Sequence, residues 1–337
     1  MRPVADGSRD PLVARYDAGL FDLDGVLYRG RWAVPGAAEA VVVARSAGMR
    51  VAFVTNNASR TPEAVAQHLT ELGIAAHPQD VVTSAQAAAT LVAELVDPGS
   101  AVLVVGGAGL RAALTDRGLR PVDSAEEGPA AVVQGWAPEV GWGMLAEGTY
   151  AVRDGLPWVA SNRDVTVPTA RGLAPGNGTL VNVIVMATGR EPVTAGKPER
   201  PLHEEAVRRT GARSPVVVGD RLDTDIEGAN AVGVASLLVL TGVTHPTDVV
   251  LAPPHRRPTY VAVDLRAGLL RPHPPVERTS GGWTCRGWEC SVADGRVRLS
   301  GSGDASDGLR AISLACWEAP AGPAPDEVHA AVSQLRL

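Results

Sequence analysis

Short apolar runs alternate along most of the chain with longer segments whose apolar residues recur at helical spacing. The apolar runs predict strands at residues 18–24, 50–57, 100–107, 130–136, 157–162, 214–220 and 235–242. The periodic segments predict helices at residues 37–48, 61–73, 108–118, 178–189 and 224–233. Strands that alternate with helices predict a parallel sheet with helices on its faces, so we assign the chain to the α/β class.

The pattern changes beyond two proline-rich stretches, residues 251–260 and 271–277. Residues 287–301 alternate in polarity around Asp294-Gly295, which predicts a β-hairpin. A helix is predicted over residues 306–319, and another over residues 325–337. We therefore expect a small α+β domain over residues 275–337. Three roles stay open for it: contact with another domain, support of a homodimer, or cover for an apolar patch of the core.

The composition of the chain limits its expected partners and cellular location. The chain has 337 residues, 45% of them hydrophobic, and a formal net charge of −6, so no global basic field recruits nucleic acid. The N-terminal segment lacks the apolar stretch of a signal peptide, and no run approaches the ~20 apolar residues of a membrane span. We expect a cytoplasmic protein with neither a nucleic-acid nor a membrane partner. The three cysteines predict ordinary thiols, because no further Cys or His pair stands at zinc spacing.

Polar residues of useful chemistry follow several predicted strands. Asp22 and Asp24 follow the first, Thr55 closes the second, and Asp220 closes the strand at residues 214–220. In an open parallel sheet the carboxyl ends of the strands form the ligand-binding edge. Each signal alone has an ordinary explanation: a turn at Asp24-Gly25, a polar strand end, or an acidic helix start at residues 220–225. Lys197, between Gly196 and Pro198, equally suits a surface loop or a phosphoryl oxygen.

Taken together, these residues supply a nucleophile, an acid or base, a hydroxyl, a cation and a carboxylate for a metal. That set suits phosphoryl transfer through an aspartyl-phosphate. The ordered segments DLDGVL (22–27), VTNN (54–57), GKP (196–198) and GDRLDTDI (219–226) resemble the four motifs of the haloacid dehalogenase (HAD) superfamily phosphatases. More narrowly, residues 15–270 resemble the class IIA group, which includes nitrophenyl and phosphoglycolate phosphatases. Segments 81–89, 221–233 and 308–319 resemble the glycerol phosphate phosphatases within that group.

The resemblance implies a fold. We expect a HAD-type Rossmann-like core at residues 11–85 and 188–270, with a parallel sheet. An inserted α/β cap domain of the C2 type is expected at residues 86–187, before the C-terminal α+β extension.

The resemblance also implies roles for single residues. Asp22 is the expected nucleophile and Asp24 the acid and base, while Thr55 and Lys197 bind the phosphoryl group. Mg²⁺ is the expected cofactor. Its ligands are Asp22, the backbone carbonyl of Asp24, and Asp220, with Asp225 at the metal directly or through water. Candidates for substrate binding are Asn56, Asn57, Asn162, Arg163 and Asp164.

The implied reaction is Mg²⁺-dependent hydrolysis of a small phosphorylated metabolite. Glycerol 3-phosphate is the first candidate, and phosphoglycolate, sugar phosphates and nucleoside monophosphates remain alternatives. A non-catalytic regulator that binds a phosphometabolite, or a phosphotransferase, would need the same residues. A dinucleotide-binding enzyme is a further alternative, because Gly107, Gly109 and Ala112 follow a predicted strand and Asp123 lies downstream.

Overall fold

The computed structural model describes residues 3–169 and 171–337, and its chain divides into two compact units. Unit 1 contains Met1–Ala52, Leu72–Ala75 and Arg209–Leu337, and unit 2 contains Phe53–Glu71 and Ala76–Arg208. The first two residues of the N-terminal segment and residue 170 lie outside the described residues. Among residues 3–169 and 171–337, no helix combines the length and apolar character needed to cross a membrane.

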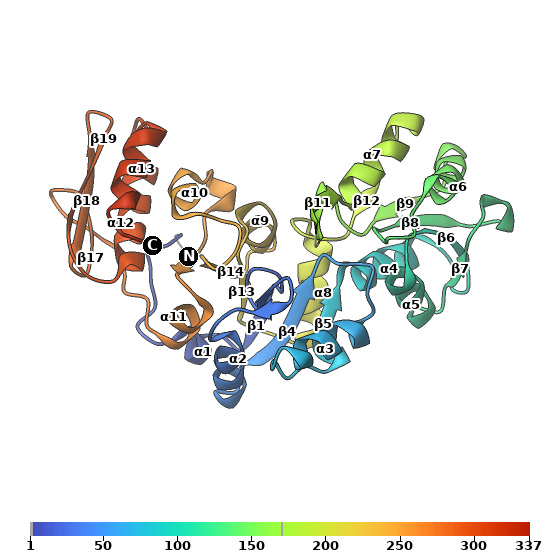
Figure 1. Cartoon of the computed structure of the whole chain (residues 1–337), viewed down its shortest axis with the longest axis horizontal. Coiled ribbons are helices and arrows are strands. Elements are labelled where there is room, and N and C mark those ends of the chain that lie inside the picture. Colours follow the sequence, from blue (N-terminus) through green and yellow to red (C-terminus); the bar gives the residue numbers. More distant parts are fainter. Residues whose placement is uncertain (1–2, 170) are drawn as a thin grey trace. The chain divides into compact units, whose positions relative to one another are not determined.

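The strands of a parallel sheet that lie wholly in unit 1 have the order β15-β14-β13-β1 (Figure 1). Its elements are α1 (Leu12–Arg15), β1 (Ala18–Phe21), β2 (Tyr28–Arg29), β3 (Trp32–Ala33), α2 (Ala37–Ser46), β13 (Pro215–Gly219), a π-helical turn (Leu222–Ile226), α9 (Glu227–Ala231), β14 (Ala235–Val239), α10 (Pro246–Leu251), a 3₁₀ turn (Pro254–Arg256), β15 (Tyr260–Ala262) and α11 (Leu265–Leu270). The register pairs Phe21 with Val218, so β1 and β13 end side by side. The predicted α/β fold with a parallel sheet is confirmed.

The C-terminal region of unit 1 is an antiparallel sheet covered by two helices (Figure 1). Its elements are β16 (Glu277–Arg278), β17 (Trp283–Cys285), β18 (Trp288–Ala293), β19 (Arg296–Gly301), α12 (Ala305–Trp317) and α13 (Pro325–Ser333). The predicted hairpin is the β18–β19 pair, and Asp294 and Gly295 both have the positive φ that its tight turn requires. All three cysteines are free and buried, and burial raises the pKa of each thiol to about 12.

One apolar cluster joins this C-terminal region to the parallel sheet. It contains Leu238 of β14, Val261 of β15, Val249 of α10, and Leu309 and Ile312 of α12. The Trp317 indole Nε1 also donates to the backbone oxygen of Val250 at 2.9 Å. Of the three roles left open by the sequence, the described contacts within unit 1 therefore support that of covering an apolar face of the core.

Unit 2 is built on a second parallel sheet, in the order β12-β9-β8-β6-β7. Its elements are β4 (Arg50–Thr55, beginning in unit 1), α3 (Pro62–Glu71), a 3₁₀ turn (Pro78–Asp80), β5 (Val81–Thr83), α4 (Ser84–Leu95), β6 (Ala101–Val105), α5 (Ala108–Asp116), β7 (Arg120–Val122), a 3₁₀ turn (Ala125–Glu127), β8 (Ala131–Gln134), α6 (Trp142–Arg153), β9 (Trp158–Ala160), β10 (Thr166–Thr169), β11 (Gly172–Pro175), α7 (Asn177–Thr188), β12 (Val193–Thr194) and α8 (Arg200–Thr210). Helices α6 and α7 cover one face, and α4 and α5 cover the other (Figure 1). The domain limits expected from the sequence stay a prediction.

The glycines that suggested a dinucleotide site have a packing role. Helix α5 begins against the loop 58–60, and the Gly109 N–H donates to the Ser59 carbonyl at 3.3 Å. A Cβ at Gly109 would lie 2.7 Å from the Arg60 oxygen and would collide with the Ala58 oxygen. Asp123, the expected ribose ligand of that alternative, forms an ion pair with Arg111. Close packing therefore explains this glycine pattern without a bound nucleotide.

Candidate active site

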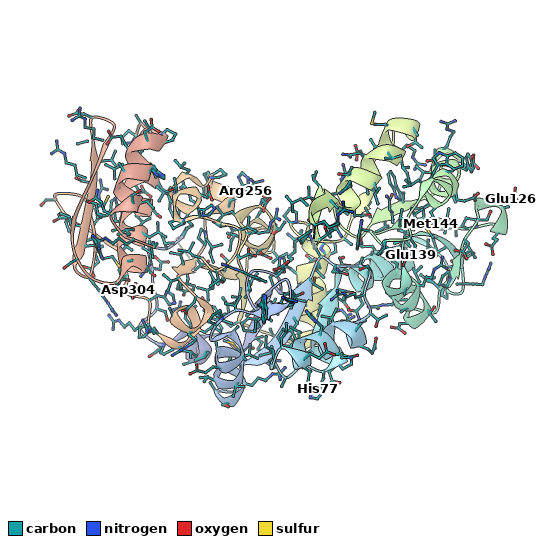
Figure 2. All side chains as sticks on the ribbon, viewed as in Figure 1. His77, Glu126, Glu139, Met144, Arg256 and Asp304 are labelled. Carbon is teal, nitrogen blue, oxygen red and sulfur yellow. The ribbon has the colours of Figure 1, made fainter. Side chains whose placement is uncertain are left out.

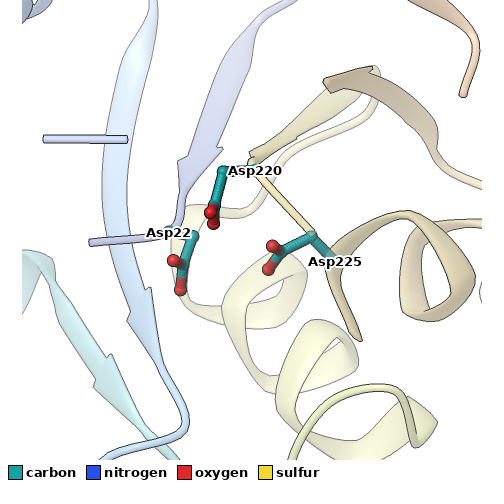
Figure 3. A group of neighbouring side chains, drawn as sticks. All are labelled: Asp22, Asp220 and Asp225. Carbon is teal, nitrogen blue, oxygen red and sulfur yellow. The ribbon is translucent and has the colours of Figure 1, made fainter. Parts of the chain in front are cut away.

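Three acidic side chains of unit 1 meet beyond the ends of two neighbouring strands. Asp22 follows β1, Asp220 follows β13, and Asp225 lies in the π-helical turn that comes next. One carboxylate oxygen from each residue lies within 4.8 Å of the other two, and Figure 3 shows the three groups converging. Asp220 and Asp225 are each 1% exposed. Such close and buried negative charges need a compensating cation.

Glycines leave the space that Asp220 occupies. Gly25 has φ +85°, and a Cβ at Gly25 or Gly242 would collide with the Asp220 carboxylate. The N–H of Val243 donates to Asp220 Oδ2 at 2.7 Å, and the Thr241 hydroxyl donates to the Gly25 carbonyl at 2.6 Å. The loop after β14 therefore holds both Asp220 and the turn after Asp24. Sequence reasoning missed this loop, because Thr241 and Val243 form no recognisable motif with the acids.

Asp24 lies on the same turn, with its side chain exposed at the surface of unit 1. Partial desolvation raises the pKa of its carboxyl, although the N–H groups of Gly30 and Gly25 and the charge of Arg29 act against the shift. A carboxyl with a raised pKa keeps its proton to higher pH, as a proton donor requires.

Asp223 lies outside the acidic cluster, although it stands between Asp220 and Asp225 in the sequence. Its carboxylate accepts two hydrogen bonds from the Arg221 guanidinium, at 3.0 and 2.9 Å. Burial opposes the shift, but these bonds and the charge of Arg221 lower the pKa of Asp223. Asp225 instead accepts the backbone N–H of Arg221 at 3.1 Å. Of the acids at residues 220–225, only Asp223 therefore matches the ordinary explanation of a helix-start acid.

Thr55, Asn56 and Asn57 lie at the end of β4 in unit 2. The Asn57 side-chain oxygen Oδ1 accepts the N–H groups of Ser59 at 2.9 Å and Arg60 at 3.2 Å. The Asn57 N–H in turn donates to the Thr55 hydroxyl oxygen at 3.1 Å. Asn57 thus shapes the loop that follows Thr55.

Asn56 connects this strand end to the loop that carries Lys197. Its side-chain oxygen accepts the Lys197 N–H at 2.8 Å, and its Nδ2 donates to the Lys197 carbonyl at 3.1 Å. The same Nδ2 lies 3.2 Å from both carboxylate oxygens of Asp164. A Cβ at Gly196 would come within 2.6 Å of the Asn56 oxygen and 2.5 Å of the Ser161 carbonyl, so only glycine allows this approach.

Lys197 is 3% exposed, and its Nζ donates to the Val54 carbonyl at 3.4 Å. Asn162 also joins this group, because its Nδ2 donates to the Asn56 carbonyl at 2.8 Å. The Ser84 hydroxyl donates to the same carbonyl at 2.6 Å. Ser84 was not predicted as part of this group, because no motif marks it in the sequence.

Arg163 is the one sequence candidate in this region that lies apart from the group. Its guanidinium forms an ion pair with Glu191 at 2.6 Å and donates to Asn182 Oδ1 at 3.2 Å. Unit 2 therefore brings together Asn56, Asn162, Asp164 and Lys197, whereas the Arg163 side chain has other partners.

Comparison with known proteins identifies the family of this chain. A haloacid dehalogenase-like hydrolase model matches residues 19–120, and a HAD-hydrolase-like model matches residues 194–268. D-glycerol 3-phosphate phosphatase of Mycobacterium tuberculosis is 47% identical over 324 residues, which are 92% of this chain and 88% of that protein. The chain therefore belongs to the haloacid dehalogenase superfamily, among its phosphatases.

Solved structures of phosphatases are also similar to this chain. The glycerol phosphate phosphatase of Mycobacterium tuberculosis in complex with magnesium has a TM-score of 0.88 and 44% identity, and the match covers 97% of this chain and 99% of that one. The p-nitrophenyl phosphatase from Archaeoglobus fulgidus has a TM-score of 0.69 and 28% identity, over 74% of this chain and 97% of that one. An acid sugar phosphatase of Staphylococcus aureus is 38% identical over 76% of this chain and 98% of that protein. Residues 285–336 separately match a GCN5-related N-acetyltransferase-like domain.

Proposed function

We propose that this chain is a Mg²⁺-dependent phosphatase that hydrolyses glycerol 3-phosphate through an aspartyl-phosphate on Asp22. The observation that carries the proposal is the convergence of Asp22, Asp220 and Asp225. It occurs in a chain that is similar, over 92% of its length, to a D-glycerol 3-phosphate phosphatase.

The acidic cluster fits Mg²⁺ by its chemistry. Hard carboxylate oxygens are the ligands this ion prefers, usually one or two of them together with water and substrate phosphate. Asp22 and Asp220 would hold the ion through their carboxylates and Asp24 through its backbone carbonyl, with Asp225 beside them. When bound, the ion neutralises the charge between these carboxylates and the substrate phosphate.

The remaining chemistry belongs to side chains of this chain. Asp22 attacks phosphorus, and the bond between phosphorus and the leaving oxygen breaks. Asp24 gives its proton to the departing alkoxide and then takes a proton from the water that hydrolyses the aspartyl-phosphate. Thr55 and Lys197 bind phosphoryl oxygens, where negative charge accumulates in the transition state.

Neighbouring polar residues position this machinery and select the substrate. The bonds from Asn56 to both backbone groups of Lys197 support a positioning role for Asn56, and Asn57 does the same for the loop after Thr55. We assign substrate selection to Asn162 and Asp164. Arg163 stays a weaker candidate, because Glu191 already pairs with its guanidinium.

A sugar phosphate is the second candidate substrate, since the acid sugar phosphatases of Staphylococcus aureus are 38% identical to this chain. That match spans 76% of this chain, whereas the match to the D-glycerol 3-phosphate phosphatase spans 92%. The longer match favours glycerol 3-phosphate. The expected cytoplasmic location and the homodimer stay predictions.

A turnover panel tests the proposal. Phosphate release from glycerol 3-phosphate, phosphoglycolate, a sugar phosphate and a nucleoside monophosphate would be measured with Mg²⁺ and with a chelator, in the presence and absence of a competing alcohol. We expect glycerol 3-phosphate to have the highest kcat/KM, and Asp22→Asn to lower kcat by roughly 10³-fold or more. Near-normal turnover by Asp22→Asn would refute the nucleophile assignment. Binding of the ester without turnover would indicate a regulator. Transfer of the phosphoryl group to the alcohol would indicate a phosphotransferase.

A further inference from the structure

Unit 1 contains a polar hollow at the start of α12, and none of the three acids of the acidic cluster lines it. Its volume is about 170 Å³. Its charged and titratable lining consists of Arg271, His273, Arg286, Asp304, Asp307 and Arg310. Figure 2 labels Asp304, whose side chain caps α12 by accepting the Ser306 N–H at 2.9 Å. The mechanism proposed above uses none of these residues.

The opposite charges around this hollow form long ion pairs. The closest ion-pair distances are 3.9 Å for Arg271 with Asp304, 3.8 Å for Arg286 with Asp307 and 3.4 Å for Arg310 with Asp307. Elsewhere in unit 1, Arg256 approaches Glu227 to 2.7 Å. Arg310 Nη1 donates to Asp307 Oδ1 at 3.4 Å. Arg271 and Arg286 lie beyond hydrogen-bond distance of the aspartates, and so they keep donors that these acids do not use.

Arg310 is the buried member of this set, at 1% exposed. Its Nη2 donates to the Val4 carbonyl at 3.0 Å, and its Nη1 lies 3.7 Å from the Cys285 sulfur. Its buried Nε has no hydrogen-bond partner among the residues that the structure describes. Asp307 pairs with the charge of Arg310, but a buried N–H donor without a partner is still costly.

The balance of charge in the hollow is positive at neutral pH. Three arginines face two aspartates there. Burial lowers the pKa of His273 to about 4, so the imidazole is neutral, and its Nε2 already contacts the Gly268 carbonyl at 2.7 Å.

From this arrangement we infer that the hollow is a binding site for a small anion that presents a phosphoryl or carboxylate group to Arg271, Arg286 and Arg310. The planar fork of arginine matches the oxygens of both groups. The volume admits a group of that size with a few carbon atoms, and is below that of a drug-sized pocket. The site gives the C-terminal region a ligand of its own, independent of catalysis.

Calorimetry on the full chain tests this inference, with inorganic phosphate and succinate as probes and a chelator present. Without metal, the carboxylates of the acidic cluster repel both anions, so heat reports the second site. The variant Arg271→Gln/Arg286→Gln alters side chains that are 69% and 60% exposed, and so spares the fold. Arg298→Gln, on an exposed position of β19 outside the hollow, is the matched control.

We expect the wild type and Arg298→Gln to bind at least one probe with equal affinity, which falls as salt rises. The affinity of the double variant for that probe should be lower by roughly tenfold or more, because charge-assisted hydrogen bonds are lost. Binding of phosphate alone would assign the site to phosphoryl groups, and binding of both probes to anions generally. Absence of binding of either probe at millimolar concentration, or equal affinity in the double variant, overturns the inference.

Discussion

The substitution Asp220→Asn separates two effects of the acidic cluster: charge repulsion in the metal-free protein and binding of Mg²⁺. The amide keeps an oxygen that accepts the Val243 N–H, now at 2.7 Å from Asp220 Oδ2, and it removes one negative charge without changing the shape. If the cluster is a cation site, this variant should stabilise the metal-free protein and weaken the Mg²⁺-bound one.

The magnitude follows from the separation of the carboxylates. The ligand oxygens lie within 4.8 Å of one another, and Asp220 takes part in two of the three pairs. Two unit charges at that distance repel by about 3.5 kcal/mol at an effective dielectric constant of about 20. Water at the half-buried Asp22 screens part of this repulsion. We therefore expect the free energy of unfolding of metal-free Asp220→Asn to exceed that of the wild type by about 1–3 kcal/mol.

Unfolding in urea, with a chelator and across a Mg²⁺ titration, provides the assay. Mg²⁺ should stabilise the wild type by RT ln(1 + [Mg²⁺]/Kd). An equal stabilisation of Asp220→Asn should require a Mg²⁺ concentration that is higher by roughly 100-fold or more. The order of stability of the two proteins should thus reverse as Mg²⁺ rises. Amide hydrogen exchange in β1 and β13 would follow unit 1 separately from unit 2.

Asp223→Asn is the matched control, because Asp223 belongs to the same turn and pairs with Arg221 at 2.9 Å. It should leave the Mg²⁺ dependence of stability unchanged. Destabilisation of the metal-free protein by Asp220→Asn, or a Mg²⁺ affinity equal to that of the wild type, would contradict a cation site at the acidic cluster.

Four further changes test the remaining contacts. Asn56→Ala removes the bonds that hold Lys197, and kcat/KM for glycerol 3-phosphate should fall by up to about 10²-fold in steady-state kinetics. Gly109→Ala forces a Cβ against the loop 58–60 and should cost about 1–3 kcal/mol in urea unfolding. Leu309→Ala opens the cluster that α12 shares with β14 and β15, at a cost of about 2–5 kcal/mol by the same measurement. The pKa of His273 is lowered to about 4 from 6.5, so its stabilising contribution is complete above pH 6.5. Stability should fall by roughly 3 kcal/mol as the pH drops from 6.5 to 4, and His273→Gln should flatten that slope in urea titrations at several pH values.

Each of these has an outcome that contradicts it. Asn182→Ala, which removes only a partner of Arg163, is the control for Asn56→Ala, and equal kinetics in the two would deny Asn56 its positioning role. An unchanged unfolding free energy in Gly109→Ala would mean that α5 has room to shift. A cost below about 0.5 kcal/mol for Leu309→Ala would show that the C-terminal helices add little to the core. A slope that survives in His273→Gln would place the pH dependence in other groups.

Much of unit 1 could be predicted from local pattern. The runs 18–21 and 215–219 are apolar because strands buried in a parallel sheet have no solvent-facing side. In the structure the first run is β1 and the second is β13. Asp22 and Asp220 interrupt those runs at the strand ends, which identified them as site candidates. The hairpin at Asp294-Gly295 was equally local, since few residue pairs accept positive φ at two successive positions.

Other features could not be predicted, because they depend on partners distant in sequence. The expected contact of Asn56 with substrate stays a prediction, and no pattern in the sequence indicated that its side chain bonds to the backbone of Lys197 and to Asp164. Arg163 was grouped with Asp164 as its neighbour, yet the guanidinium pairs with Glu191. The glycine pattern at residues 107–109 matched a nucleotide fingerprint, although the loop 58–60 explains it.

The sequence by itself determined which residues end the strands and which chemistry they carry, because periodicity and turn preferences act between neighbours in the chain. The resemblance implied that Asp225 lies at the metal, but only the tertiary structure gives the approach of its carboxylate to Asp22 and Asp220 and the pairing of Asp223 with Arg221. It alone placed Arg310 in a buried hollow. The reason is physical: electrostatic and packing energies depend on distances of a few ångströms, and only the folded chain sets those distances.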